Sequence, residues 1–317
     1  MGTVRTVTGD IDSGTLGHCQ CHEHIFLAKG KSYEVNPALW MDDEAASRRE
    51  LNLYKEAGGG TIVDAQPVGG GSMPRQLYDA SVTTGIRIVA STGFHKLIFY
   101  PEDHWLFTAE ADEIAEYFTY DITIGMAGDA DNDRPFYRYG TRAGIIKCAL
   151  DMQGLEGVYT KLFRAAVNAH MATNAPIMVH TEDGAHAGEL VDFMTGLGVL
   201  PEKLILCHME RSVTRMDEKI RAAKTGVYLQ CDTIARYKYH NDEDEALFLK
   251  RMCDEGLEER LLLGLDTTRQ RLKSYGGETG LDYILTDFLP LLKKQGFSDE
   301  QLHRFCAENP AQALCIT

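Results

Sequence analysis

Six side chains that are able to bind a metal ion or move a proton stand at the ends of short apolar runs. The runs end in His22-Glu-His24, Lys147, His180, His208 and Asp266. Imidazole and carboxylate groups are the usual ligands of zinc and similar divalent ions. Two histidines separated by one residue point to the same face of a strand, because side chains alternate along it. The pattern therefore predicts one shared metal site.

Each of these residues also has a simpler explanation when it is taken alone. A single strand histidine is more often a hydrogen-bonded core residue than a ligand, and Asp266 also suits a turn or a helix N-cap. Lys147 is harder to explain, because an unpaired buried ammonium is costly to remove from water. Six coincidences at equivalent positions are improbable, so we favour the metal site. Five other histidines lack this placement and are expected to be structural: His18, His95, His170, His186 and His303.

A repeating pattern of strands and helices must position these residues. Apolar or β-branched runs predict eight strands at 16–24, 61–64, 86–92, 144–147, 177–180, 204–208, 227–232 and 261–266. Helical patterns are present at 42–57, 158–173, 187–197, 214–224, 242–255, 279–295 and 299–306, and the gap between 92 and 144 is expected to carry inserted loop helices.

Eight alternations of strand and helix within 317 residues predict an α/β protein with a single (β/α)₈ TIM-barrel domain over residues 1–317. The active site of this fold lies at the C-terminal mouth of the barrel, where the six residues would converge. A doubly wound sheet is the structural alternative. It requires a glycine-rich phosphate loop after the first strand, where this chain has His22-Glu-His24.

In this order, the six residues resemble the phosphotriesterase-like family of the amidohydrolase superfamily. The resemblance extends to Val7-Thr-Gly9, Thr61-Ile-Val-Asp64, Ala90-Ser-Thr-Gly93 and Glu308-Asn-Pro-Ala311. It implies a binuclear centre of two divalent ions, with Zn²⁺ expected and Mn²⁺ or Co²⁺ as alternatives. His22, His24 and Asp266 would bind the more buried ion, and His180 and His208 the more exposed one. Lys147 would be an N6-carboxylysine that bridges both ions.

The resemblance also implies a metal-dependent hydrolase of ester bonds, in which a hydroxide that bridges the two ions attacks the substrate. Asp266 would take up the proton, and Lys147 would serve the reaction through its bridging carbamate. The chain has no Gly-x-Ser-x-Gly sequence, so a serine-hydrolase mechanism has no support.

Two loops indicate the substrate. The segments 232–240 and 266–277 contain five cationic side chains, although the whole chain has a net charge of −15. Loops after the last two strands of a barrel often hold a phosphate group. A solvated charged loop is the simpler alternative. The loops resemble those of the branch that hydrolyses phosphorylated sugar lactones, which implies that Lys238 and Arg269 bind the phosphate, with Tyr275, Arg236 and Arg271 as further candidates.

These observations predict the opening of a phosphorylated aldonolactone, a small anionic substrate. A promiscuous phosphotriesterase or an acyl-homoserine lactonase is the alternative, but either would favour an apolar mouth without a cluster of cations. A non-catalytic binding protein on the same scaffold would be expected to lose metal ligands, and all six are present here.

The overall composition excludes several other classes of protein. The chain is 44% hydrophobic and 25% charged, and its net charge of −15 disfavours nucleic acid and anionic membranes as partners. No apolar run approaches the roughly 18 residues of a membrane span, and residues 1–14 lack the apolar segment of a secretory signal. We expect a cytoplasmic protein whose eight cysteines are reduced thiols, and a homodimer is one assembly compatible with it.

Overall fold

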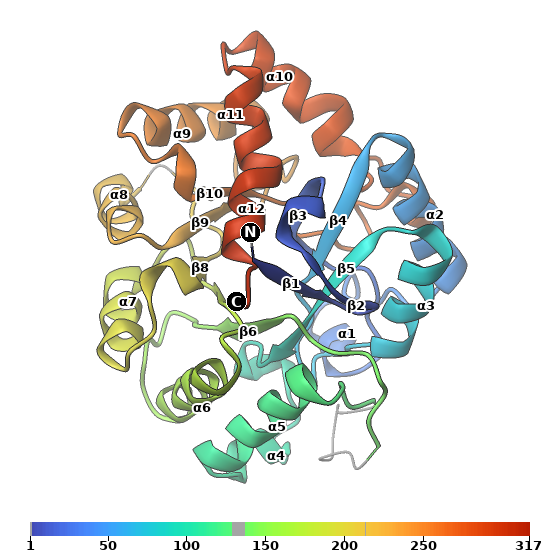
Figure 1. The fold of residues 1–317 in the computed structure, drawn as a ribbon, viewed down its shortest axis with the longest axis vertical. Coiled ribbons are helices and arrows are strands. Elements are labelled where there is room, and N and C mark those ends of the chain that lie inside the picture. The colour runs from blue at the N-terminus through green and yellow to red at the C-terminus, as the bar shows by residue number, and fades with distance from the viewer. Residues whose placement is uncertain (1, 129–136, 213) are drawn as a thin grey trace.

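The chain folds around a sheet of eight parallel strands whose order in space is their order in the sequence (Figure 1). A computed structural model describes residues 2–128, 137–212 and 214–317. The strands are β3 (His18–Glu23), β4 (Gly59–Asp64), β5 (Arg87–Gly93), β6 (Ile145–Ala149), β7 (Ile177–His180), β8 (Leu204–Leu206), β9 (Tyr228–Cys231) and β10 (Leu261–Leu263). Beyond β10, the amide of Asp266 donates to the carbonyl of His22 in β3 (3.0 Å), which brings the last strand against the first. The predicted (β/α)₈ barrel is confirmed.

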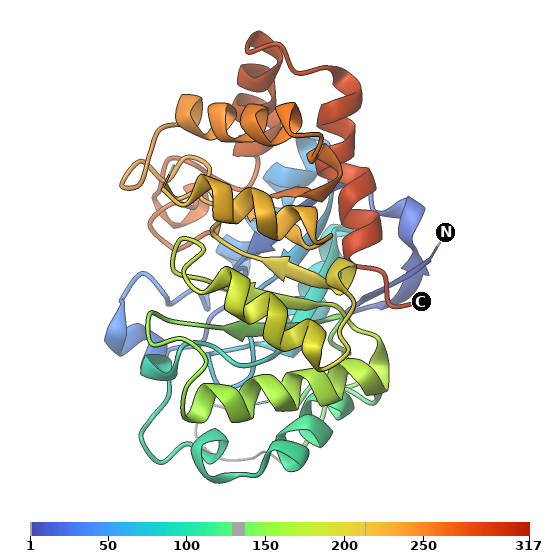
Figure 2. The ribbon, with the colours of Figure 1, turned by 90° about the vertical axis from the view of Figure 1, so that its left-hand side faces the viewer.

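Helical segments follow each strand and cover the outside of the barrel (Figure 2). They are α2 (Glu44–Glu56), α3 (Pro74–Thr84), α5 (Ala111–Thr123), α6 (Val158–Thr173), α7 (Ala187–Gly196), α8 (Met216–Lys224), α9 (Asp242–Asp254), and the π-helix η6 (Ile284–Phe288) continued by α10 (Leu289–Lys294). Because both faces of the sheet are covered, the strands are continuous apolar runs, and all five residues of β6 are buried.

The structure differs from the sequence prediction mainly in its additional short elements. The loops at the mouth contain the unpredicted elements α1 (Lys31–Val35) and the 3₁₀ turns η2 (Leu97–Phe99) and η5 (Lys273–Tyr275), whereas α4 (Trp105–Thr108) belongs to the predicted insertion. The expected inserted helices after β5 are α4 and α5, while residues 129–136 of that insertion lie outside the described residues. The helix predicted from residue 279 begins only at Ile284, because residues 276–280 include two glycines with positive φ.

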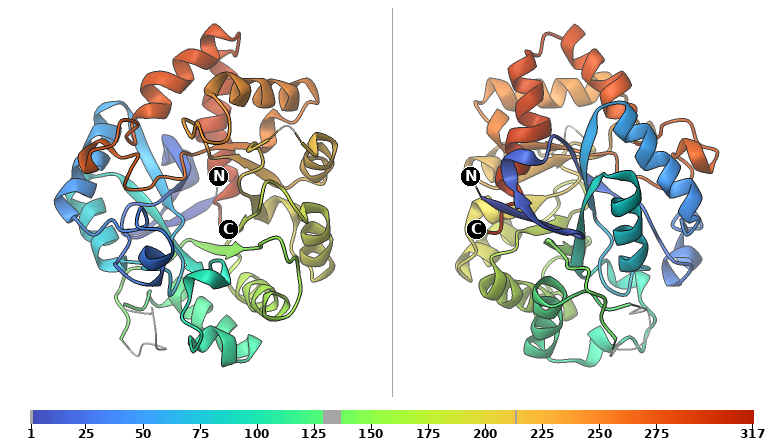
Figure 3. Two further views of the ribbon diagram at one scale, coloured as in Figure 1. Left: turned by 180° about the vertical axis from the view of Figure 1, so that it is seen from behind. Right: turned by 45° about the vertical axis from the view of Figure 1, so that its right-hand side comes forward.

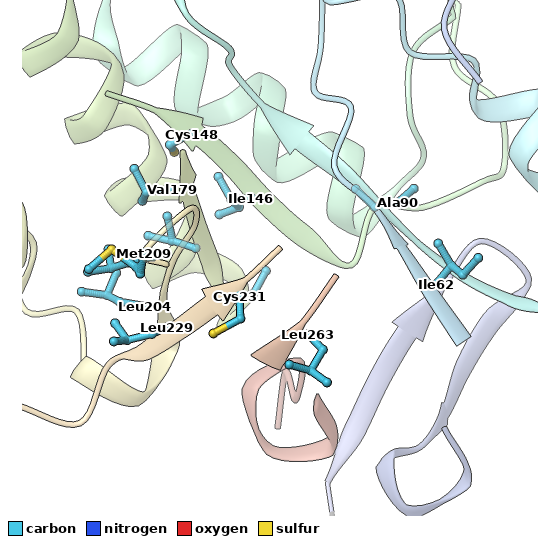
Figure 4. Close-up of a cluster of buried hydrophobic side chains, with 14 of the residues drawn as sticks. Ile62, Ala90, Ile146, Cys148, Val179, Leu204, Met209, Leu229, Cys231 and Leu263 are labelled. Carbon is cyan, nitrogen blue, oxygen red and sulfur yellow. The ribbon is translucent and has the colours of Figure 1, made fainter. Parts of the chain in front are cut away.

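Side chains of each strand alternate between the interior of the barrel and the layer under the helices. In β10, Leu262 packs inside with Ile145 and Met178, whereas Leu261 and Leu263 join the larger cluster beneath the helices. Figure 4 shows side chains of that larger cluster along the strands, among them Ile62, Ile146 and Leu263. The packed interior leaves the strand ends as the place where polar groups can gather.

Both chain termini lie at the end of the barrel opposite the mouth (Figures 1 and 2). The hairpin of β1 (Thr3–Thr6) and β2 (Gly9–Asp12) meets the C-terminal helices there, which are α11 (Asp299–His303), η7 (Arg304–Glu308) and α12 (Asn309–Ala313). The left panel of Figure 3 shows the mouth end, where the loop that contains α1 comes forward. Among the described residues, no helix is long and apolar enough to cross a membrane.

His18, predicted to be structural, begins β3 at the closed end of the barrel. Its Nδ1 lies 2.8 Å from the Tyr54 hydroxyl, which also contacts the carbonyls of His18 and Thr61. Burial lowers the pKa of His18 from its ordinary value of 6.5 to about 4. The side chain therefore ties β3 to α2 in its neutral form.

The lowered pKa of His18 predicts a pH-dependent stability. Below pH 6.5 the unfolded chain takes up a proton at His18 that the folded chain does not. The contribution of neutral His18 to the free energy of unfolding is therefore fully present above pH 6.5 and is lost as the pH falls towards 4. Between about pH 7 and about pH 5, the wild-type free energy of unfolding should fall about 2 kcal/mol further than that of His18→Gln. Urea denaturation at both pH values measures this difference, and parallel pH curves would contradict the prediction.

Candidate active site

The ends of the strands surround a polar cavity of about 220 Å³ at the mouth of the barrel. Its lining includes all six predicted metal ligands, which are His22, His24, Lys147, His180, His208 and Asp266. A larger and more apolar cavity of about 540 Å³ lies between η6, α10 and α11, but none of the six residues lines it. The smaller cavity is therefore the candidate active site.

One group of donors forms where β3 meets the end of β10. Single ligand atoms of His22, His24 and Asp266 all lie within 4.8 Å of one another. Asp266 Oδ1 is 3.4 Å from His24 Nε2 and 3.8 Å from His22 Nε2. Two imidazoles and one carboxylate oxygen that face a common point are a suitable donor set for a divalent ion.

A second pair of donors forms at the ends of β7 and β8. His180 Nδ1 and His208 Nε2 are 2.7 Å apart. Lys147 lies in the middle of β6, and its Nζ is 3.3 Å from His22 Nε2 in the first group. The structure thus brings together the two sets of ligands that the family resemblance assigned to two ions, with the lysine beside the first set.

Two of these residues have a backbone conformation that L-residues seldom adopt. His208 has a φ of 63° and Asp266 a φ of 48°, each shortly after its strand ends. The left-handed conformation costs about 1–3 kcal/mol and recurs at functional sites. Here both residues remain nearly buried and line the cavity, so the turn directs a polar side chain inward where the strand would have continued.

A buried carboxylate behind the ligands serves both groups of donors. Asp232 Oδ1 lies 2.6 Å from His208 Nδ1, and its Oδ2 lies 2.9 Å from His22 Nδ1. Gln230 Oε1 also approaches His22 Nδ1, at 2.9 Å. These contacts orient the Nε2 atoms of both rings into the cavity, as the outer partners of metal-binding histidines do.

The protonation of the rings mostly favours metal binding. Burial lowers the pKa of His24 and His208, and it lowers that of His180 to about 4, so these rings are neutral with a free lone pair. Burial and Lys147 also lower the pKa of His22, but Cys207 and Asp232 outweigh them and raise it to about 10. A bound ion would take the place of the proton that these neighbours favour on His22.

Two buried lysines have very different surroundings. Lys219 is 1% exposed, and its Nζ lies 2.8 Å from Asp183 Oδ1. Lys147 is equally buried, but in the part of the chain that the structure describes it has contacts to His22 and the Cys207 thiol and no ion pair. A buried amine without an acidic partner is suited to a change of charge state, as carboxylation would provide.

Cations surround the other oxygen of Asp266. Arg236 Nη1 makes a short ion pair with Oδ2, and Arg211 Nη2 lies 3.4 Å from it. Burial raises the pKa of Asp266, but Arg236 and the hydrogen bond with His24 outweigh it and hold the pKa well below its usual range. The carboxylate thus faces ligand histidines with one oxygen and guanidinium groups with the other.

The residues predicted to bind substrate fall into two groups. Arg236 and Lys238 line the cavity. Arg269, Arg271 and Tyr275 do not line it in this structure. Arg269 stacks against the rings of Trp40 and Tyr275, 4.8 and 5.4 Å from their centroids, next to the cavity residue Thr268.

Arg271 and Tyr275 hold the loops together. Arg271 donates to the carbonyls of Leu265 and Ile234, while the Tyr275 hydroxyl contacts Ser47 Oγ at 2.9 Å. Both side chains already form hydrogen bonds within the protein, so we do not propose either as a substrate contact.

Several residues of the cavity were not predicted from the sequence. Arg211, Lys96 and Glu182 line it, as does His95, which was expected to be structural only. Arg211 follows His208 by three residues and Glu182 follows His180 by two, so each belongs to a strand-end loop. Proximity to a predicted ligand was the signal that could have indicated them.

Comparison with known proteins agrees with this geometry. The model of the phosphotriesterase family matches residues 2–314. The chain belongs to this family. A phospho-furanose lactonase from Mycoplasmopsis synoviae is 31% identical over 99% of this chain and 92% of its own.

Solved structures of the phosphotriesterase family share the whole barrel. An amidohydrolase from Mycoplasma synoviae has a TM-score of 0.93 and 30% identity, and covers 100% of this chain and 92% of its own. A lactonase from Listeria monocytogenes has a TM-score of 0.90 and 27% identity over 99% of both chains. As a member of the phosphotriesterase family with such relatives, the chain is a hydrolase that acts on esters.

Replacement of Lys147 tests the metal centre. Lys147→Ala should lower both the content of divalent metal and the activity, because the side chain that would join the two groups of ligands is lost. Elemental analysis of purified protein gives the number of ions per chain. Lys219→Ala is the matched control, since it removes an equally buried lysine and should lower stability but not metal content. Wild-type metal content in Lys147→Ala would contradict the assignment.

Proposed function

We propose that the protein opens a phosphorylated sugar lactone, in its furanose form, at a binuclear metal centre. The names of the relatives support a lactone substrate, and the phospho-furanose lactonase among them supports a phosphorylated one. The observation that carries the proposal is the combination of clustered metal ligands with two nearby cations that form no ion pair within the described residues.

Lys238 and Arg269 are the cations available to a phosphate group. The contacts of Lys238 Nζ are with the Tyr239 ring, 4.5 Å from its centroid, and those of the Arg269 guanidinium are with Trp40 and Tyr275. Neither forms an ion pair within the described residues, although the chain carries 47 acidic side chains against 32 basic ones. Cations kept unpaired on an acidic protein favour an anionic ligand.

The residues around the cavity would bind the metal ions and transfer the proton. His22, His24 and Asp266 would hold one ion, His180 and His208 the other, and Lys147, as N6-carboxylysine, would bridge them. Bound divalent ions, with Zn²⁺ the expected metal, supply a Lewis acid and acidify a water molecule to near neutral pH. Arg236 fixes the Asp266 carboxylate so that one oxygen faces the ligand histidines. Asp266 is then placed to accept a proton from the attacking water and return it to the ring oxygen.

Removal of the base tests the role of Asp266. Asp266→Asn keeps an oxygen and nearly the same shape but cannot accept the proton, so kcat should fall by about 10²–10⁴-fold while KM changes little. Steady-state kinetics on the preferred lactone, at a metal content matched to wild type, measures both constants. A variant with wild-type kcat and a raised KM would remove Asp266 from proton transfer.

A substrate panel tests the proposed function itself. Phosphorylated furanose aldonolactones should be hydrolysed much faster than the same lactones without phosphate, than acyl-homoserine lactones and than phosphotriesters. Lys238→Ala or Arg269→Ala should lower kcat/KM for the phosphorylated lactone by about 10- to 150-fold, since a charge-assisted contact contributes roughly 1.5–3 kcal/mol. Both variants should hydrolyse an unphosphorylated lactone as wild type does.

Lys250→Ala is the matched control for these variants, because Lys250 is an exposed lysine on the outer helix α9. It should leave both substrates unaffected. Equal losses on the phosphorylated and unphosphorylated lactones would mean that Lys238 and Arg269 support the loops, and the phosphate site would be wrong. A preference for phosphotriesters or acyl-homoserine lactones would overturn the substrate assignment.

A further inference from the structure

Glu182 stands beside His180 at the wall of the cavity. It follows His180 by two residues, in the loop after β7. Its Oε1 lies 3.3 Å from His180 Nε2, and Lys96 Nζ makes a short ion pair with the same oxygen. Lys96 belongs to the loop after β5, so the pair connects two loops on either side of β6, the strand that carries Lys147.

The contact determines which nitrogen of His180 is free. His180 Nδ1 faces His208 Nε2 at 2.7 Å, so Nδ1 is the atom on the side of the proposed metal. A proton on Nε2 would be donated to Glu182 and would leave the Nδ1 lone pair available. Glu182 Oε1 lies by the other nitrogen of the ring, which makes it a partner of the ligand and not a further ligand.

His208 has the same arrangement with a different carboxylate. Its Nδ1 lies 2.6 Å from Asp232 Oδ1, and its Nε2 faces His180. Each of the two histidines assigned to the more exposed ion therefore has a carboxylate behind it. The two carboxylates differ in burial, since the Asp232 side chain is 0% exposed and that of Glu182 is 27% exposed.

Lys96 gives the exposed carboxylate a fixed position. Without a partner, a glutamate with this exposure would rotate into solvent at a small cost in free energy, because fixing its three side-chain torsions at the ring reduces its conformational entropy. The ion pair restrains it at the ring and also neutralises its charge. Because Glu182 is paired, its carboxylate does not weaken the attraction of Lys238 and Arg269 for an anionic substrate.

We propose that Glu182, held by Lys96, is the positioning residue of His180 and sets the affinity of the more exposed metal site. The inference rests on the binuclear centre proposed above. It predicts that loss of Glu182 weakens one of two metal sites, whereas loss of a ligand common to both would empty both.

Metal titration of the metal-free protein tests this prediction without any substrate. Competition with a chromophoric chelator should give two Zn²⁺ sites of different affinity in wild type. Glu182→Ala should lower the affinity of the weaker site by about 10- to 100-fold and leave the tighter site unchanged. Glu182→Gln should lose less, because its amide oxygen still accepts from the ring, and Lys96→Met should give an intermediate loss.

Glu189→Ala is the matched control. Glu189 also pairs with a histidine, His186 Nδ1 at 3.2 Å, on the same side of the barrel but away from the ligands. The Glu189→Ala variant should bind both ions with the affinities of the wild type. Excess Zn²⁺ should restore kcat in Glu182→Ala, which would not occur if the side chain acted directly in the reaction.

Three results would overturn the proposal. Wild-type affinity at both sites in Glu182→Ala, with a raised KM alone, would make Glu182 a substrate contact. Equal loss of both ions together with a lower Tm would give it a general structural role. A wild-type chain that binds a single ion would exclude the second site and the binuclear centre together. Failure to hydrolyse phosphorylated lactones, with both ions bound normally, would contradict the proposed substrate and leave the role of Glu182 standing.

Discussion

The hydrogen bond from the Asp266 amide to the His22 carbonyl joins the last strand of the barrel to the first. It also sets the chemistry, because it brings the carboxylate of Asp266 within 3.4 Å of His24 Nε2. Once the sheet closes, the C-terminal ends of all eight strands face one mouth. Lys147, His180 and His208 then have no position open to them except around the same cavity. Closing the sheet into a barrel therefore also assembles the candidate metal centre.

The mouth contains several buried ionisable groups, each of which would be costly to bury without a partner. Lys147 is a buried amine beside His22 that has no acidic partner in the described part of the chain, and Asp266 is a buried carboxylate that depends on Arg236 and on the histidines. A divalent ion would be attracted by the carboxylate and repelled by an ammonium at Lys147, and the proposed carboxylation of that amine would resolve the conflict. Further out, the charges of Lys96 and Glu182 are paired, whereas Lys238 and Arg269, the proposed phosphate contacts, form no ion pair within the described residues.

Two of the candidate ligands are among the seven described residues other than glycine that adopt a positive φ. His208 and Asp266 both adopt positive φ just after strands of three residues. A continued strand would carry the next side chains along the barrel wall, whereas the left-handed turn keeps them at the mouth. Asp232 receives the amide and the ring of His208, so the strained turn is held by the same carboxylate that orients the ring.

The sequence by itself determined the barrel and its six candidate ligands, because buried parallel strands are visible as apolar runs and each ligand ends such a run. It also showed five cations in the segments 232–240 and 266–277 of a chain with a net charge of −15, and the family resemblance selected Lys238 and Arg269 among them. Only the tertiary structure decided that Arg271 and Tyr275 serve the loops and that Arg211, Lys96 and Glu182 belong to the mouth. Strand positions follow from short apolar runs that are local in the sequence, whereas the direction of a loop side chain depends on contacts with loops from other strands. Those contacts exist only after the sheet has closed.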